Sequence, residues 1–285
     1  MLTLDGVAVA SAWPEGPGSY SEDVVRIDPA MGVAIVAAGY GVIGGQGQPA
    51  ATLALWSVLG ELRAAAATGA PIDAALDAGL ARAHTAVERL TAAWRPGLHK
   101  PFATIAVLAL DRGGDRAWVA HVGACRVSRV ADAIAPLTID HTVGRDHPEV
   151  PAHLRDIVTV ALGFSATRDI SAIPVAAGDR LLLAGPQLHR ALPDADLRAC
   201  ADPDPARFAA ALEARVTTAR EYGTVAFAFV DVVDRAAPGD AIGHDREPPR
   251  SWLYAPGAPL PDPPTSLPDG PFPAWWTDVA GLAPR

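Results

Sequence analysis

Residues 32–45 read GVAIVAAGYGVIGG, and the rest of the chain is organised around this stretch. Its β-branched, apolar first half predicts a buried strand. The glycines that follow predict a loop of the kind that brings backbone close to a ligand, and a helical pattern begins near Pro49. Between Val36 and Gly45 there is no Asp, Glu, His, Lys, Arg, Ser or Thr. The loop therefore has the shape of a ligand-binding site but lacks the polar and charged side chains that such sites normally use.

Composition narrows the class of protein. The chain has 285 residues, half of them hydrophobic, and a net charge of −9, so we expect a large packed core. No cluster of Lys or Arg is present, which argues against nucleic-acid binding. The N-terminus lacks the pattern of a signal peptide, and no long apolar run predicts a membrane span. Two distant cysteines fit a reducing compartment, so we expect a cytoplasmic protein without a membrane partner. The Ala- and Arg-rich composition is typical of GC-rich bacteria.

Periodicity predicts strands and helices in a regular order. Three strands joined by short turns open the chain and favour an antiparallel start. Two amphipathic helices follow and predict a hairpin that covers one sheet face. Strands then dominate, before one short and one longer helix and a last apolar strand. In chain order, the expected strands are 3–13, 23–28, the run after Gly32, 102–110, 117–122, 126–130, 170–175, 180–184 and 224–233, and the expected helices are 50–68, 71–90 and two within 193–219.

The composition changes after residue 235, which predicts a domain of residues 1–235 and an extension of residues 236–285. Twelve of the 27 prolines lie between Pro238 and Pro284, so ordinary helices or central strands are excluded there. Three of the seven tryptophans lie there too, although disordered tails are normally poor in aromatic residues. We interpret the extension as a strap whose aromatic side chains dock on the domain itself or on a partner.

Eight segments in sequence order resemble the metal-dependent PPM-type (type 2C) protein phosphatases. The resemblance covers about residues 3–234 and implies an α+β fold, a four-layer α-β-β-α sandwich of two antiparallel sheets with a helix pair outside each. The segments are Ser21-Glu22-Asp23, Val36 to Gly41, Phe102-Ala103-Thr104, Ala120 to Arg126, Leu137-Thr138-Ile139-Asp140-His141, Val160-Ala161-Leu162-Gly163, Gly178 to Leu188, and Glu221 to Val225.

The same resemblance implies that the catalytic chemistry has been lost. Phosphatases of this family hold two Mg²⁺ or Mn²⁺ ions through aspartates, and the ions activate the attacking water. Where the family has these aspartates, this chain has Ala38, Ala124 and Pro186. The phosphate-binding arginine of the family falls on Gly18, and residues 14–21 contain no Arg or Lys. We therefore expect no catalytic residues and no cofactor.

The remaining carboxylates form a remnant site in this interpretation. Asp23 and Glu22 match the family, and Glu221 stands where it has the last aspartate. They either hold a single weak cation or serve as solvated or backbone-capping groups. Gly39, Tyr40 and Gly41 are the candidate binding residues of the remnant cleft. Tyr40, which replaces a family methionine, is expected to fill the metal cavity with its ring.

Other candidate residues have simpler interpretations. His121 is expected to be a satisfied histidine within a sheet, and Cys125 a small buried residue. His141, His147 and His153 lie six residues apart, which leaves a zinc site open as a minor alternative.

The leading hypothesis is a pseudophosphatase that acts as a binding or regulatory module for a protein partner, a phosphoprotein or a kinase. One alternative is residual Ser/Thr phosphatase activity with Mg²⁺ or Mn²⁺ on Asp23, Glu22 and Glu221. Another alternative is a cleft reused for a small molecule.

Overall fold

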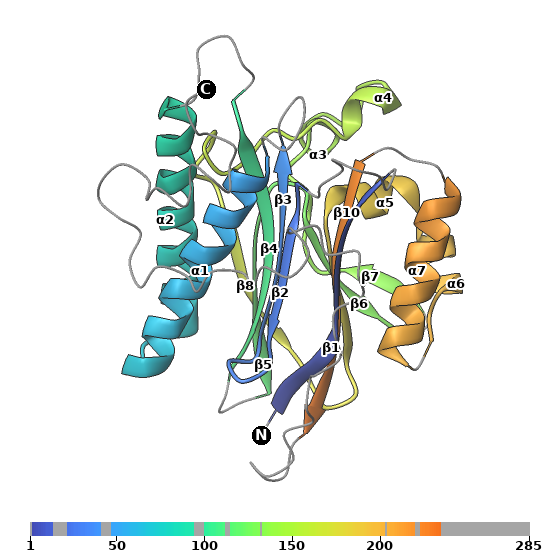
Figure 1. The fold of residues 1–285 in the computed structure, drawn as a ribbon, viewed down its shortest axis with the longest axis horizontal. Coiled ribbons are helices and arrows are strands. Elements are labelled where there is room, and N and C mark those ends of the chain that lie inside the picture. The colour runs from blue at the N-terminus through green and yellow to red at the C-terminus, as the bar shows by residue number, and fades with distance from the viewer. Residues whose placement is uncertain are drawn as a thin grey trace.

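The computed structural model shows two β-sheets packed face to face, with helices on both outer faces (Figure 1). All strand pairs in both sheets are antiparallel, as the α+β expectation requires. The residues that the structure describes are 2–13, 22–40, 47–93, 100–111, 115–131, 133–202, 204–219 and 223–234. The extension of residues 236–285, expected to be a strap, lies outside them.

The first sheet contains the strand that opened the sequence analysis. Its spatial order is β2-β3-β4-β5-β8. Along β3, alternate side chains face opposite sides, because a strand has a side-chain period of two. Val33, Ile35 and Ala37 face the helices, whereas Ala34, Val36 and Ala38 face the other sheet. The strands are β2 (Val24–Asp28), β3 (Val33–Tyr40), β4 (Phe102–Leu110), β5 (Arg116–Val122) and β8 (Asp169–Pro174).

A helical hairpin covers the outer face of this sheet, as the apolar stripes predicted. Helix α1 spans Gln48–Thr68 and α2 spans Ile72–Ala93. Gly69 ends α1 at φ 74°, a left-handed conformation that favours glycine, and its N–H donates to the Ala65 carbonyl. The apolar faces of both helices form one buried core with β3, β4 and β5. This core packs against one face of β3 along its length.

The second sheet joins the two ends of the described chain. Its spatial order is β1-β10-β9-β6-β7. Its outer face is covered by three helices, which pack through a cluster that includes Phe208, Phe227 and Phe229. The elements are β1 (Leu2–Trp13), β6 (Arg126–Val130), β7 (Ile134–Pro136), β9 (Arg180–Ala184), β10 (Gly223–Asp234), α5 (Pro186–Ala191), α6 (Asp194–Ala199) and α7 (Pro205–Ala219).

The antiparallel start was only partly correct. β2 and β3 pair as expected, but β1 pairs with β10 in the other sheet, so that Leu2 lies opposite Asp234. Local periodicity does not reveal this partner, because it lies more than two hundred residues further along the chain. Short elements were also missed: β7, α5, and the helices α3 (Val143–Asp146) and α4 (Ala152–Arg155) in the long connection from β7 to β8. Elements of three to six residues are too short to show a period.

No helix in the described part of the chain is long and apolar enough to cross a membrane.

Candidate functional site

The end of β3 lies beside two other segments that the sequence analysis linked to metal binding. Ala38 is 2% exposed and faces the space between the sheets. Asp23 is 4% exposed, and its Oδ1 accepts the Gly39 N–H at 3.2 Å. A Cβ placed on Gly185 would lie 3.7 Å from the Ala38 Cβ and 3.5 Å from Asp23 Oδ2. The fold therefore brings the β2, β3 and β9 ends together in one remnant cleft.

The turn between β5 and β6 closes the same cleft from another side. Gly123 makes this turn at φ 87°, and at this point the chain passes from one sheet to the other. Ala124 is 3% exposed and Cys125 is fully buried. The Cys125 Sγ lies 3.2 Å from the Thr104 hydroxyl. Burial raises the pKa of the Cys125 thiol to about 12, so it stays protonated and acts as a small buried residue.

Tyr40 occupies the mouth of the cleft. Its ring stacks on Phe102 with centroids 4.8 Å apart and planes 8° apart. Burial raises the pKa of Tyr40 above its usual range, and the neighbouring Cys125 and Asp23 act in the same direction. The hydroxyl is thus a neutral group at physiological pH. This placement puts an aromatic ring between the two sheets, close to Asp23 and Cys125.

The side chains in the cleft do not fit a pair of divalent ions. Mg²⁺ and Mn²⁺ require oxygen ligands, and a protein usually holds each ion through one or two carboxylates, with water completing the shell. At the positions that the fold brings together, the described residues offer the Asp23 carboxylate, two methyl groups and the ring of Pro186, which is buried at the start of α5. Since an alanine or proline side chain carries no donor atom, no step of a metal-dependent reaction can be derived for this cleft.

The other predicted site residues are divided between described and undescribed parts of the chain. Gly39 lies in close contact with backbone: a Cβ there would lie 2.3 Å from the Gly47 oxygen and 2.5 Å from the Glu22 oxygen. Glu22 thus contributes its main chain to the cleft wall, and its side chain is partly exposed. Gly41 and Glu221, together with Gly18, lie outside the described residues.

The structure also assembles a cluster that the sequence analysis missed. The cluster consists of His121 on β5, Asp169 on β8, and His141 in the connection from β7 to β8. Their potential ligand atoms lie within 4.8 Å of one another. His121 is a satisfied sheet histidine, as expected, because its Nε2 lies 3.0 Å from the Ile139 carbonyl. Asp169 had not been singled out. The cross-strand register that places it opposite His121 depends on the pairing of β5 with β8, which local patterns do not show.

The geometry of this cluster does not suit a metal ion. A zinc ligand must point its ring nitrogen at the ion, about 2.0–2.1 Å away and near the ring plane. The rings of His121 and His141 are stacked, with centroids 4.6 Å apart and planes only 24° apart. Near-parallel planes at this separation do not meet within the length of a metal bond. His147 and His153 are exposed on the surface, where His147 pairs with Glu149, so the six-residue spacing does not form a zinc site either.

A salt bridge at the edge of the cleft is built from a preserved motif. Arg126 on β6 binds both carboxylate oxygens of Asp140 at 2.8–3.0 Å.

Nearby on α5, both ring nitrogens of His189 are buried and lack a hydrogen-bond partner among the described residues. Burial, with a contribution from the Arg126 charge, lowers the pKa of His189 to about 3. His189 is therefore neutral under ordinary conditions.

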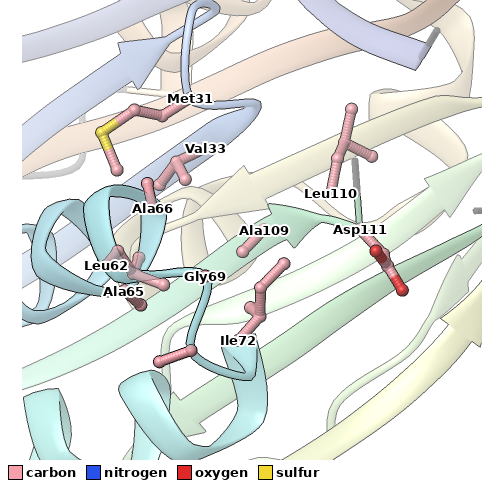
Figure 2. A pocket seen from close by; sticks show the side chains of 11 residues that line it. Met31, Val33, Leu62, Ala65, Ala66, Gly69, Ile72, Ala109, Leu110 and Asp111 are labelled. Carbon is pink, nitrogen blue, oxygen red and sulfur yellow. The ribbon is translucent and has the colours of Figure 1, made fainter. Parts of the chain in front are cut away.

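A hollow elsewhere on the molecule is unrelated to the cleft. An apolar pocket lies beside the turn from α1 to α2, as Figure 2 shows. Its volume is about 210 Å³. It is lined by Met31 and Val33 at the start of β3 and by Leu110 and Asp111 at the end of β4. Ala38 lies at the other end of β3, about 17 Å away along the strand. Among the described residues that line the pocket, Asp111 is the only one with a charge, so the pocket offers little for binding a polar ligand.

Comparisons with known proteins identify the fold. Neither a family model nor a curated protein matches the sequence. Among solved structures, the catalytic domain of the serine/threonine protein phosphatase PstP, in complex with two manganese ions, has a TM-score of 0.66 and 22% identity over 82% of this chain and all of that one. PppA from Pseudomonas aeruginosa, a key regulatory component of T6SS, has a TM-score of 0.65 and 20% identity over 81% of this chain and all of that one.

The PPM Ser-Thr phosphatase MsPP from Mycobacterium smegmatis gives a TM-score of 0.63 and 21% identity over 80% of this chain and 97% of that one. All three likenesses span nearly the whole of the other protein and most of this chain. They agree with the sheet order, the two helical layers and the resemblance found in the sequence. This chain has the fold of the PPM-type Ser/Thr phosphatases.

Proposed function

We propose that this protein is a pseudophosphatase: a cytoplasmic binding or regulatory module with a PPM-type fold and impaired catalysis. The observation that carries the proposal is the content of the remnant cleft. Ala38, Ala124 and Pro186 are buried, and the sequence resemblance places the family's metal-binding aspartates at these positions. Removing the ions would remove both the activated water and the charge that stabilises the transition state.

The surface offers a candidate region for binding a protein partner. Ile139, Ile157 and Phe164 are the large hydrophobic residues that are most exposed in the described chain, at 50–74%. All three lie in the connection from β7 to β8, residues 137–168, which we call the β7–β8 connection. Exposed apolar side chains concentrated in one segment favour protein binding over a purely solvated surface. A phosphoprotein or a kinase is the partner class that we propose, since the three compared structures are phosphatases or a regulator.

Catalysis can be tested directly. We expect no turnover of p-nitrophenyl phosphate with Mn²⁺ or Mg²⁺, and no thermal shift on adding either ion or Ca²⁺. A Mn²⁺-dependent PPM phosphatase assayed in parallel supplies the positive control. Turnover that is abolished by Asp23→Ala would overturn the proposal and establish the alternative of an altered metal site.

A gain-of-ligand variant tests whether the cleft has lost only its ligands. In Ala38→Asp/Pro186→Asp, carboxylates return to two of the family's positions. We expect this variant to be less stable than the natural protein without metal, because two further buried carboxylates lie near Asp23. We also expect Mn²⁺ to raise its melting temperature, with no such shift in the matched Ala38→Ser/Pro186→Ser control. An equal Mn²⁺ shift in the natural protein would contradict the proposal.

Partner binding is tested with surface variants. In pull-downs, Ile157→Ser/Phe164→Ser should lose a partner that the natural protein retains, while Ala201→Ser, an exposed change beyond α6, should not. Melting temperatures should stay within about 2 °C, because these side chains are already in water. Dephosphorylating the lysate beforehand separates phosphoproteins from other partners. Identical partner sets for both variants would exclude the β7–β8 connection as the binding surface.

The C-terminal extension is a separate part of the proposal. We propose that residues 1–235 form the phosphatase-like domain and that residues 236–285 add a docking segment. A chain ending at residue 235 should keep its melting temperature if the extension serves a partner, and lose that partner in the same pull-downs. A lower melting temperature with an unchanged partner set would favour docking on the domain itself.

A further inference from the structure

The β7–β8 connection is attached to the sheets by a small set of buried polar contacts. The His141 N–H donates to the Gly123 carbonyl at 2.9 Å, and the Gly123 N–H donates back to the His141 ring at Nδ1, at 3.0 Å. The Thr159 N–H donates to the His141 carbonyl at 2.9 Å, so the returning chain is tied to the same residue. His141 is therefore the point where both arms of the connection meet the β5–β6 turn.

These contacts fix the protonation of the two histidine rings. Since Nδ1 of His141 accepts the Gly123 N–H, the single ring proton must be on Nε2, where it is donated to Asp169 Oδ2 at 3.0 Å. The Ile139 carbonyl can only accept, so His121 likewise carries its proton on Nε2. Both rings are only 2% exposed, and they are stacked on each other. The closed arrangement thus specifies two neutral rings of defined tautomer.

A second proton on either ring opposes the closed arrangement. On His141 it would occupy Nδ1 and face the Gly123 N–H, which would leave a buried donor without its acceptor. On His121 it would place a buried cation against the neighbouring ring, and burial already lowers the pKa of His121. In an opened connection both rings would meet water, where neither penalty applies.

The charged groups around the pair do not remove this penalty. Asp169 on β8 favours a cation, but it is 46% exposed and is therefore screened by solvent. Arg145 on α3 approaches the same carboxylate to 3.8 Å and offsets it. Asp140 is neutralised by its two-pronged pairing with Arg126 on β6. The rings therefore face two carboxylates that are each already paired with an arginine.

We propose that the stacked pair His121–His141 is a proton-sensitive latch that holds the β7–β8 connection against the β5–β6 turn and releases it in mild acid. The latch is closed when both rings are neutral. Opening lets the His121 ring take up a proton that its buried place in the stack opposes, so the fraction open increases as the pH falls below about 6.5. The inference concerns the attachment of this segment and stands whether or not the chain binds a partner.

Hydrogen exchange on the full chain tests the latch. Protection factors, corrected for intrinsic exchange, should be measured between pH 7 and pH 5 for the amides of Gly123, His141, Val143 and Thr159. We expect these factors to fall by about 10- to 100-fold over this range, one factor of ten per pH unit for each proton taken up at the limit. Amides in the centre of the sheets, such as those of Val36 and Ala106, should change less than about threefold. Equal loss at both sets, or no loss at either, would overturn the proposal.

Two matched variants assign the effect to the stacked rings. His121→Phe keeps an aromatic ring in the stack but cannot take up a proton, so the dependence of protection on pH should weaken. His147→Gln removes an exposed histidine from the same connection and should leave that dependence unchanged. The reverse pattern would contradict the latch.

If His121→Phe does not fold, the ring tautomers can be read from nitrogen chemical shifts of the natural protein. The latch requires the proton of both neutral rings to be on Nε2. A proton on Nδ1 of His141 would exclude it.

Discussion

The remnant cleft and the neighbouring salt bridge each take one residue from the same short stretch, residues 123–126, yet the two residues differ in their chemistry. In the cleft, Ala124 is a buried methyl group where the family places a metal ligand. Two residues later, Arg126 keeps a full two-pronged bond to Asp140. Within the same stretch, a side chain that ties two segments of the chain together lies two residues from one that carries no polar atom. The fold depends on the first side chain, whereas any chemistry in the cleft would depend on the second position.

The largest effect on stability is expected at Gly39, where two backbone segments of the cleft wall are in close contact. In Gly39→Ala, the new methyl group would lie 2.3 Å from the Gly47 oxygen, and backbone cannot move aside easily. We expect the free energy of unfolding to fall by about 3 kcal/mol or more, measured by urea denaturation. Gly60→Ala on α1 is the control, because nothing lies within 4 Å of its added methyl group, and it should gain about 0.5–1 kcal/mol. Equal effects at both glycines would show that the cleft wall is not tightly packed.

The second effect concerns the preserved salt bridge. Arg126→Ala removes both bonds to Asp140 and leaves that carboxylate without its cation, so we expect a loss of about 2–3 kcal/mol. The matched control is Arg168→Ala, which breaks the exposed pair with Asp77 and should cost less than about 1 kcal/mol. If the two variants lose the same stability, the contrast between a structural bridge and a surface pair is wrong.

The third effect is a pH dependence that arises from His189. The native state keeps this imidazole neutral down to about pH 3, while the unfolded chain protonates it near pH 6.5. Stability should therefore be complete above pH 6.5 and fall as the pH decreases towards 3, by up to about 1.4 kcal/mol per pH unit.

His189→Phe should flatten this slope in urea denaturation at pH 7, 6 and 5. His153→Phe, a change at an exposed histidine, should not. A slope unchanged by His189→Phe would show that the ring is accessible to protons in the folded protein.

The smallest effect on stability is expected at the cleft thiol. Because burial raises the pKa of Cys125 to about 12, the native protein should not react with a thiol reagent at pH 8. A Cys200→Ser background makes Cys125 the only thiol, and labelling should then appear only on unfolding. Rapid labelling of the folded protein would mean that the cleft is open at this side.

Much of the fold was predictable from the sequence, because long periodic segments determine most of it. The paired apolar stripes of α1 and α2 and the continuous apolar run of β3 are local signals, and they correctly predicted a helical hairpin and a buried strand. The partner of β1 was not predictable in this way, because the pairing of Leu2 with Asp234 joins the two ends of the described chain. The position of Asp169 opposite His121 was not predictable either, because it depends on the pairing of β5 with β8, which are distant in the sequence.

For the cleft, the sequence predicts which ligand side chains are missing but not how the positions are arranged. The sequence shows that the side chains of Ala38 and Pro186 carry no ligand atoms, but it does not show that these positions converge. That conclusion depends on Gly185 approaching Ala38 and Asp23 in the folded chain. The stacking of Tyr40 on Phe102 was also beyond local reasoning, since it follows from the register of β3 against β4.

The pairing of the first strand with the last has a consequence for biosynthesis. The sheet of β2, β3, β4, β5 and β8 takes all of its strands from residues 24–174. This sheet can therefore form before the last third of the chain has been translated. The other sheet needs β9 and β10 before β1 has a partner, so the N-terminal strand must wait for most of the chain to be translated. Because Leu2 lies opposite Asp234, a short linker between them, in a chain without residues 235–285, should yield a circularly permuted protein in which β10 and β1 are consecutive and can pair as a local hairpin.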